Sequence, residues 1–156
     1  MKRTQFERVI QTPVGKLTLC ADEAGLCALR FGAQSGRADA LPLLDQAQRE
    51  LEEYFAGRRS VFSVPLSIHG TAFQERVWRA LMEIPCGETI TYGELARRVG
   101  NEKACRAVGM ANHVNRIPIF IPCHRVVGAN GKLTGYAGGL EIKRILLETE
   151  GVDVKV

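Results

Sequence analysis

The sequence predicts two small domains: an α/β domain over residues 1–69, followed by a mainly α domain over residues 70–156 that contains a winged helix-turn-helix. Three observations favour this division. Strand-like apolar stretches flank a turn in the first third of the chain. Helix-start signals accumulate after residue 70, and the pattern changes near residues 67–70. A chain of 156 residues is long enough for two such domains.

The first domain is expected to pair a small sheet with one helix. Apolar stretches at residues 17–20 and 26–29 flank the turn-forming residues 22–25, which predicts a hairpin from Val14 to Phe31. Apolar residues at helical spacing between Leu43 and Phe55 predict a helix that closes at Gly57. Alternating apolar residues over 62–68 predict a further strand. Nothing in this half suggests chemistry, so we interpret it as scaffold.

The second domain opens with helix signals. Thr71 with Gln74 forms a capping box, and Thr91 with Glu94 predicts a second one at the start of a short helix. Asn101 is expected to cap the next helix, because a Gly-Asn turn separates the two and gives the outline of a helix-turn-helix. The inner face of that helix is predicted to hold Ala104, Ala107, Val108 and Ala111, and its outer face Arg106, Gly109, Met110 and His113.

The wing is predicted from the segment after this helix pair. Val126-Val127 and Leu133-Thr134 flank Ala129-Asn130-Gly131-Lys132, which favours a two-residue type I′ hairpin. A glycine-rich loop over residues 135–139 leads to a last helix from Leu140 to Glu150.

Composition narrows the function. The chain is 46% hydrophobic and 24% charged, which is typical of globular proteins and excludes a disordered tail or a membrane protein. Five cysteines without a CxxC pair fit a reducing compartment and disfavour a disulfide framework or a zinc finger. Residues 97–132 hold seven Lys or Arg against one acid, Glu102. This basic stretch points to a nucleic acid partner.

Residues 121–125 read Ile-Pro-Cys-His-Arg and place Cys123 and His124 side by side in the basic stretch. A positive field biases a thiol toward the nucleophilic thiolate. On an extended segment adjacent side chains point to opposite faces, so proton transfer would need a bridging water or a bent backbone. Glu150, at a helix C-terminus, needs a compensating cation or partner, and a histidine would serve. Tyr92, at the start of the first short helix, is placed to reach a phosphate or a base.

These residues, with others in the second domain, resemble one family. The matching motifs are Pro122-Cys123-His124-Arg125-Val126, Thr71-x-Phe73-Gln74-x-x-Val77-Trp78, Ile84-Pro85-x-Gly87-x-Thr89-x-x-Tyr92, Arg106-Ala107-Val108-Gly109, Gly135-Tyr136-Ala137-Gly138-Gly139 and Leu146-Leu147-x-x-Glu150-Gly151. In this order they resemble the O6-alkylguanine-DNA alkyltransferases, most of all the bacterial members. The match spans residues 70–151, and the first 65 residues resemble the family's ribonuclease H-like N-terminal domain.

The resemblance implies direct-reversal DNA repair: irreversible, single-turnover transfer of an alkyl group from O6-alkylguanine, and O4-alkylthymine, to Cys123 after nucleotide flipping. It implies that His124 takes the thiol proton through a water and Glu150, that Tyr92 rotates the phosphate and protonates the leaving guanine, and that Asn115 is a hinge. The implied DNA contacts are Arg106, Tyr92, Gly109, Met110 and Ala107. The implied substrate pocket is Val126, Tyr136, Ala137, Gly138 and Pro118.

The implied partner is double-stranded DNA with alkylated bases, bound by a monomer in the cytoplasm, at the nucleoid in a bacterium, with no membrane contact. No cofactor is expected. No metal is expected either, because the N-terminal Cys/His set that binds zinc in certain animal members is absent. Two alternatives remain at this point. A non-catalytic winged-helix protein would bind or sense alkylated DNA and leave Cys123 incidental. A Cys-His hydrolase or acyl transferase would need an oxyanion hole and leave Arg106 without a role.

Overall fold

The structure, a computed structural model, describes residues 5–154. It divides into two compact units, Met1–His69 and Gly70–Val156. The predicted fold class, a small sheet with a helix followed by a mainly helical unit, is confirmed. Among the described residues no helix is long and apolar enough to cross a membrane.

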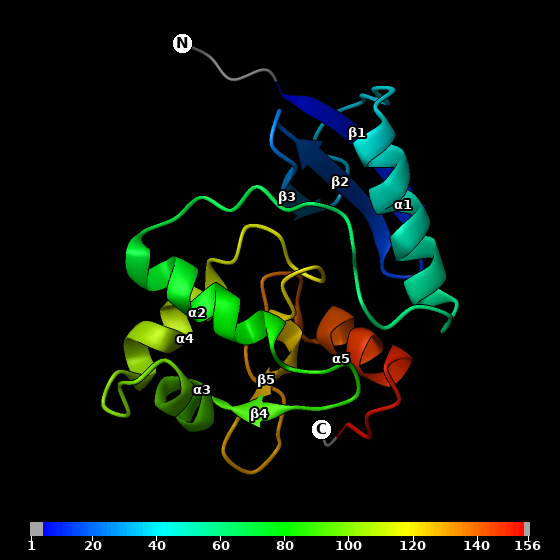
Figure 1. Cartoon of the computed structure of the whole chain (residues 1–156). Coiled ribbons are helices and arrows are strands. Elements are labelled where there is room, and N and C mark those ends of the chain that lie inside the picture. The colour runs from blue at the N-terminus through cyan, green and yellow to red at the C-terminus, as the bar shows by residue number, and fades with distance from the viewer. Residues whose placement is uncertain (1–4, 155–156) are drawn as a thin grey trace. The chain divides into compact units, whose positions relative to one another are not determined.

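The first unit is a three-stranded antiparallel sheet covered by one helix (Figure 1). Strands β1 (Phe6–Thr12), β2 (Gly15–Ala21) and β3 (Leu26–Phe31) pair in the order β1-β2-β3, and α1 spans Pro42–Phe55. The predicted hairpin and helix are confirmed by β2, β3 and α1. Strand β1 was not predicted. Its side chains are half-buried or exposed except for Ile10, so the sequence shows no clear period of two there.

The strand predicted over residues 62–68 is wrong. Only an isolated bridge between Leu26 and Leu66 forms in this segment. The amides of Ser63 and Val64 instead donate to the buried carboxylate of Glu50, at 2.8 and 3.1 Å. Pro65 has no amide hydrogen to donate to a ladder. Two amides of this segment therefore donate to a buried carboxylate and not to a neighbouring strand.

The second unit is mainly helical (Figure 1). Helices α2 (Ala72–Met82), α3 (Tyr92–Arg98), α4 (Cys105–His113) and α5 (Leu140–Thr149) surround two short strands, β4 (Ile90–Thr91) and β5 (Val126–Val127), and the 3-10 turn η1 (Cys123–Arg125). The capping box at Thr71 is confirmed. Indole Nε1 of buried Trp78 donates to the Ala111 carbonyl at 2.8 Å and ties α2 to α4.

The helix-turn-helix differs in detail from the prediction. Thr91 caps α3, but the Glu94 carboxylate binds Arg97 and Arg98 and does not complete a capping box. Helix α4 begins at Cys105 with Ala104 as N-cap and no side-chain cap, so Asn101 does not cap it. Ala107, predicted on the inner face, is exposed. The buried polar residue of this helix is Asn112, which the apolar pattern does not reveal.

The wing also takes another form. Strand β5 pairs in parallel with β4, with Ile90 opposite Val126. The turn at residues 128–131 is present, since the Gly131 amide donates to the Gly128 carbonyl at 2.9 Å. Among the described non-glycine residues only Ile119 has a positive φ, so Asn130 does not take the left-handed conformation that type I′ requires. Gly131, the last residue of this turn, takes the left-handed conformation with a φ of 79°.

Candidate active site

Cys123 lies in a buried and bent segment that follows α4. Residues 117–127 are all buried. Asn115 organises the bend: its Nδ2 donates to the Ile121 carbonyl at 2.8 Å, and its Oδ1 accepts from the Ile117 amide at 3.0 Å. Ile119 takes a φ of 75°, which is strained for a β-branched residue. The backbone then turns as η1 at Cys123. This turn is the bent backbone that adjacent Cys and His side chains require to act together.

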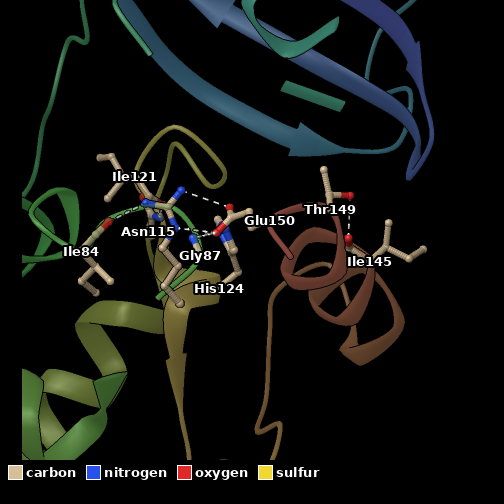
Figure 2. A network of polar contacts seen from close by, with 9 residues as sticks. Ile84, Gly87, Asn115, Ile121, His124, Ile145, Thr149 and Glu150 are labelled. Carbon is tan, nitrogen blue, oxygen red and sulfur yellow. Dashed lines mark hydrogen bonds and ion pairs between the residues drawn. The ribbon is translucent and has the colours of Figure 1, made fainter. Parts of the chain in front are cut away.

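Within residues 5–154, three residues donate hydrogen bonds to the carboxylate of Glu150, the C-cap of α5 (Figure 2). Its carboxylate accepts from His124 Nε2 at 2.6 Å and from Arg125 Nε at 2.8 Å. The Gly87 amide approaches it at 3.4 Å. Both the His124 ring and the Glu150 side chain are fully buried. The compensating cation that Glu150 needs is therefore Arg125, which also donates to the Ile84 carbonyl at 2.6 Å.

The protonation state of His124 follows from this network. Complete burial lowers the pKa of His124, against the opposing effect of Glu150. The imidazole is therefore neutral, and Arg125 balances the carboxylate charge. A carboxylate can only accept hydrogen bonds, so Nε2 carries the proton and Nδ1 is left as an acceptor. Nδ1 is buried and has no hydrogen-bond partner within residues 5–154. The ring is thus prepared to accept a proton.

Burial of the Cys123 thiol opposes the bias toward thiolate that the basic stretch predicts. Burial raises its pKa to about 11, although a hydrogen bond from Asn115 and the charge of Lys143 oppose this effect. Three cations of the basic stretch are paired with carboxylates and not with the thiol. Arg97 and Arg98 bind Glu94, and Arg125 binds Glu150. Loss of hydration outweighs the positive field of this stretch, so deprotonation of the thiol must accompany the reaction.

Helix α4 presents an open face beside Tyr92. Arg106, Ala107 and Met110 are exposed on it. A Cβ atom at Gly109 would lie 3.8 Å from the Tyr92 ring, an ordinary van der Waals distance, so Gly109 and Tyr92 are neighbours. The Tyr92 hydroxyl is 2.8 Å from the Thr134 hydroxyl. Of the seven cations in residues 97–132, four are exposed and form no ion pair with another described residue: Lys103, Arg106, Arg116 and Lys132.

The residues expected to line a substrate pocket are brought together only in part. Val126, Pro118 and Tyr136 are buried, Gly138 is half-buried and Ala137 is exposed. Val126 follows η1 directly. Among the described residues no hydrogen bond joins Ala137 or Gly138 to Cys123, so their place in the pocket stays a prediction.

Sequence reasoning missed three residues of this site: Arg125, Thr134 and Lys143. Arg125 stands in the family motif but was given no role. Lys143 left a signal, because Lys143, Leu146, Leu147 and Glu150 follow the i, i+3, i+4, i+7 spacing of one helix face. The described residues contain no group of three His, Cys, Asp or Glu that could hold a metal ion.

The geometry can be compared with known proteins. The family described as "6-O-methylguanine DNA methyltransferase, DNA binding domain" matches residues 72–152, and the one described as "6-O-methylguanine DNA methyltransferase, ribonuclease-like domain" matches residues 6–68. The chain belongs to the 6-O-methylguanine DNA methyltransferase family. The resemblance drawn from the motifs is confirmed.

Individual members of the family match nearly end to end. The methylated-DNA–protein-cysteine methyltransferase of Methanosarcina acetivorans is 49% identical over 153 residues, covering 94% of this chain and 98% of the relative. The constitutive enzyme of Bacillus subtilis is 45% identical, with 93% and 94% covered. The crystal structure of Mycobacterium tuberculosis OGT in complex with DNA superposes with a TM-score of 0.86 at 48% identity, over 93% and 92%.

Proposed function

We propose that this chain repairs DNA by moving an alkyl group from the O6 of guanine, and from the O4 of thymine, to Cys123. The observation that carries the proposal is the buried His124–Glu150 pair next to Cys123, with His124 Nδ1 left as an acceptor. Relatives of this chain are named methylated-DNA–protein-cysteine methyltransferases, and one related structure contains DNA.

The chemistry balances within this set of residues. The Cys123 proton passes through a water to His124 Nδ1, and Glu150 stabilises the imidazolium that forms. The thiolate attacks the alkyl carbon, so an S–C bond forms as the C–O bond to guanine breaks. Tyr92 donates a proton to the leaving guanine and recovers one from solvent. The products are a thioether and an unmodified base. A thioether offers no easy return, so each molecule acts once.

The lesion must leave the duplex before it can meet Cys123, because a stacked base hides its O6 substituent. We propose that α4 binds the duplex through its exposed face, with Arg106 filling the gap that the flipped nucleotide leaves. Gly109, Met110 and Ala107 give the DNA an uncharged surface around that arginine. Tyr92, held against Gly109, contacts the rotated phosphate.

The pocket assignments remain proposals of the same kind. The carbonyls of Cys123 and Val126 hold the guanine amino group, and Pro118, Tyr136 and Gly138 line the pocket. The Ala137 amide donates to the exocyclic oxygen, and Asn115 joins α4 to the active-site turn. The Asn115 hydrogen bonds to residues on both sides of the bend support this hinge role. We also propose a monomer that works in the cytoplasm, at the nucleoid in a bacterium.

One experiment tests the proposal. Purified protein is incubated with a duplex that carries one O6-methylguanine, and its peptides are then analysed by mass. The expected result is one added methyl group on the Cys123 peptide, in stoichiometric amount, with unmodified guanine restored in the DNA. Tight binding of the duplex without any change in mass would indicate a non-catalytic binder. Methyl on Cys86 or Cys105 would remove Cys123 from its role.

A further inference from the structure

Lys143 is a buried cation that no carboxylate of residues 5–154 pairs with. The residue stands on the inner face of α5, between the first turn and Leu146, and is fully buried. Within residues 5–154 none of the ion pairs includes it. Buried ammonium groups are costly unless they are paired or hydrogen-bonded, so a lysine kept here calls for a reason.

The ammonium group joins two segments of the candidate pocket. Its Nζ donates to the Val126 carbonyl at 2.7 Å and to the Thr134 carbonyl at 3.2 Å. Val126 follows the active-site turn, and Thr134 precedes the glycine-rich loop. The Thr134 hydroxyl in turn is 2.8 Å from the Tyr92 hydroxyl. One side chain therefore fixes the strand after Cys123, the entrance of the loop and, through Thr134, the tyrosine.

The charge also acts on the thiol. Among the described residues, Lys143 is the cation whose field lowers the pKa of Cys123, and a Cys123 thiolate raises the pKa of Lys143. Burial brings the pKa of Lys143 down to about 8, so the group is mostly protonated at neutral pH.

The other charged groups near the active-site turn are either paired or, like Arg76 of α2 and Arg116 after α4, exposed to solvent. On the turn itself and at the end of α5, His124 and Arg125 are bound to Glu150. On α2, which also packs against the turn, Glu75 pairs with Arg79. The segment after α4 contributes the neutral amide of Asn115. Lys143 is therefore the charge available to respond when the thiol ionises.

We propose that Lys143 is a positioning residue of the transfer reaction: its ammonium clamps the Val126 and Thr134 carbonyls and is the fixed counter-charge of the Cys123 thiolate. The inference rests on the proposed function only for the use of that thiolate. His124 takes the proton, and Lys143 stabilises the anion that remains. The resting protein holds an ammonium beside a thiol, and the reacting protein holds an ammonium beside a thiolate.

The first test compares Lys143→Gln, which keeps a donor but loses the charge, with Lys143→Arg, which keeps the charge. Arg144→Gln on the exposed side of α5 is the control, because its pairs with Glu141 and Glu148 lie at the surface. Alkylation of Cys123 by iodoacetamide is followed by peptide mass from pH 6 to pH 10. This readout requires no methyltransferase activity, so it separates the inference from the proposed function.

Lys143→Gln should shift the alkylation profile to higher pH and slow the reaction by about tenfold or more near neutral pH, because a nearby opposite charge moves a pKa by about one to three units. Lys143→Arg should recover most of the rate, and Arg144→Gln should match the parent. Methyl transfer by Lys143→Gln should fall by a similar factor, with DNA affinity unchanged. Slower transfer with an unshifted alkylation profile would reduce Lys143 to a structural role and overturn the proposal.

A second measurement does not depend on how the lysine variants fold. The parent and Cys123→Asp, which puts a permanent anion at this position, are labelled with ¹³C-lysine, and Lys143 is titrated by NMR. The carboxylate should raise the apparent pKa of Lys143 above the parent value, because a nearby opposite charge favours the ammonium form. Identical Lys143 titration curves in the two proteins would overturn the proposal even if every Lys143 variant unfolded.

Discussion

Each of the two units buries one glutamate, and the two carboxylates are held in different ways. In the first unit Glu50 is 1% exposed and accepts from the Ser63 and Val64 amides and from Gln46. These donors are amide N–H groups, which cannot accept a proton. In the second unit Glu150 is bound to His124, whose other nitrogen is buried and unpartnered within residues 5–154. Both units bury a carboxylate, but only the carboxylate of the second unit is bound to a group, the His124 ring, that can accept a proton.

A similar contrast separates two clusters of nucleophile, histidine and acid. Ser67 is 2.7 Å from Asp22 and 2.9 Å from His69 in the first unit. The Ser67 hydroxyl donates to a carboxylate whose pKa is lowered by that bond and by backbone amides that fix a turn. The hydroxyl is therefore held by the acid and is not activated by the histidine. Residue types alone would rank this cluster with the one at Cys123, and the direction of the hydrogen bonds separates them.

The largest expected effect tests that contrast directly. Cys123→Ser should abolish methyl transfer from O6-methylguanine DNA, because a hydroxyl is a far weaker nucleophile than a thiolate near neutral pH. Ser67→Ala should transfer at the parental rate. Both rates are measured in single turnover by mass analysis, with DNA affinity as the control for folding. A loss of transfer in Ser67→Ala would break the comparison and give the first unit a chemical role.

The second effect separates the buried carboxylates. Glu150→Gln should lower the transfer rate by about 10²–10⁴, the usual contribution of general base catalysis, because His124 loses the charge that stabilises its protonated form. Glu50→Gln should leave the rate unchanged and reduce the free energy of unfolding by about 1–3 kcal/mol, because the Ser63 and Val64 amides lose a charged acceptor. Rates are compared below the melting temperature of both variants. Equal rates for the two variants would contradict a catalytic use of Glu150.

Local patterns predicted the elements that depend on neighbours in sequence. The capping box at Thr71, the hairpin of β2 and β3, and the end of α1 near Gly57 were all foreseen, because each rests on residues a few positions apart. The parallel pair of β4 and β5 was not, since two-residue strands carry no period. The strand expected at 62–68 did not form, because the Ser63 and Val64 amides donate to Glu50, which lies 13 and 14 positions earlier in the chain.

For the candidate site too, the sequence predicted some residues and missed those whose role depends on distant contacts or on burial. The motif around Cys123 named His124 and Glu150, and the structure brings them together at 2.6 Å. The motif did not show that Arg125 carries the charge that balances Glu150, since the contact between them spans 25 positions. The basic stretch suggested a thiolate, yet a count of charges cannot include the burial that raises the pKa of Cys123. Lys143 was visible only as a cation on an apolar helix face, a signal of burial and not of role.

A third, smaller effect concerns DNA contact in the second unit. Arg106→Ala should slow transfer from duplex DNA by roughly 10- to 100-fold, because base flipping costs a few kcal/mol that the arginine offsets. Reaction with the free base O6-benzylguanine should be nearly unchanged, because a free base needs no flipping. Arg49→Ala, an exposed arginine of the first unit, is the control and should affect neither substrate. Equal losses on duplex and free base would remove Arg106 from this role.

The smallest expected effect is a difference in how the two units respond to acid. Complete burial lowers the pKa of His124 below its usual 6.5, so the unfolded state binds a proton that the folded state refuses. The stability of the second unit is therefore fully present above pH 6.5 and declines as the pH falls below it, by up to about 1.4 kcal/mol per pH unit. In the first unit the hydrogen bonds of Glu50 hold its pKa below 4.5 against the effect of burial, so its contribution is lost only as the pH falls below 4.5. Hydrogen exchange, corrected for intrinsic rates, should show α5 losing protection between pH 6.5 and 5 while β2 keeps it. In His124→Gln this loss should disappear, and an unchanged loss in that variant would show that some group other than the imidazole sets the acid response.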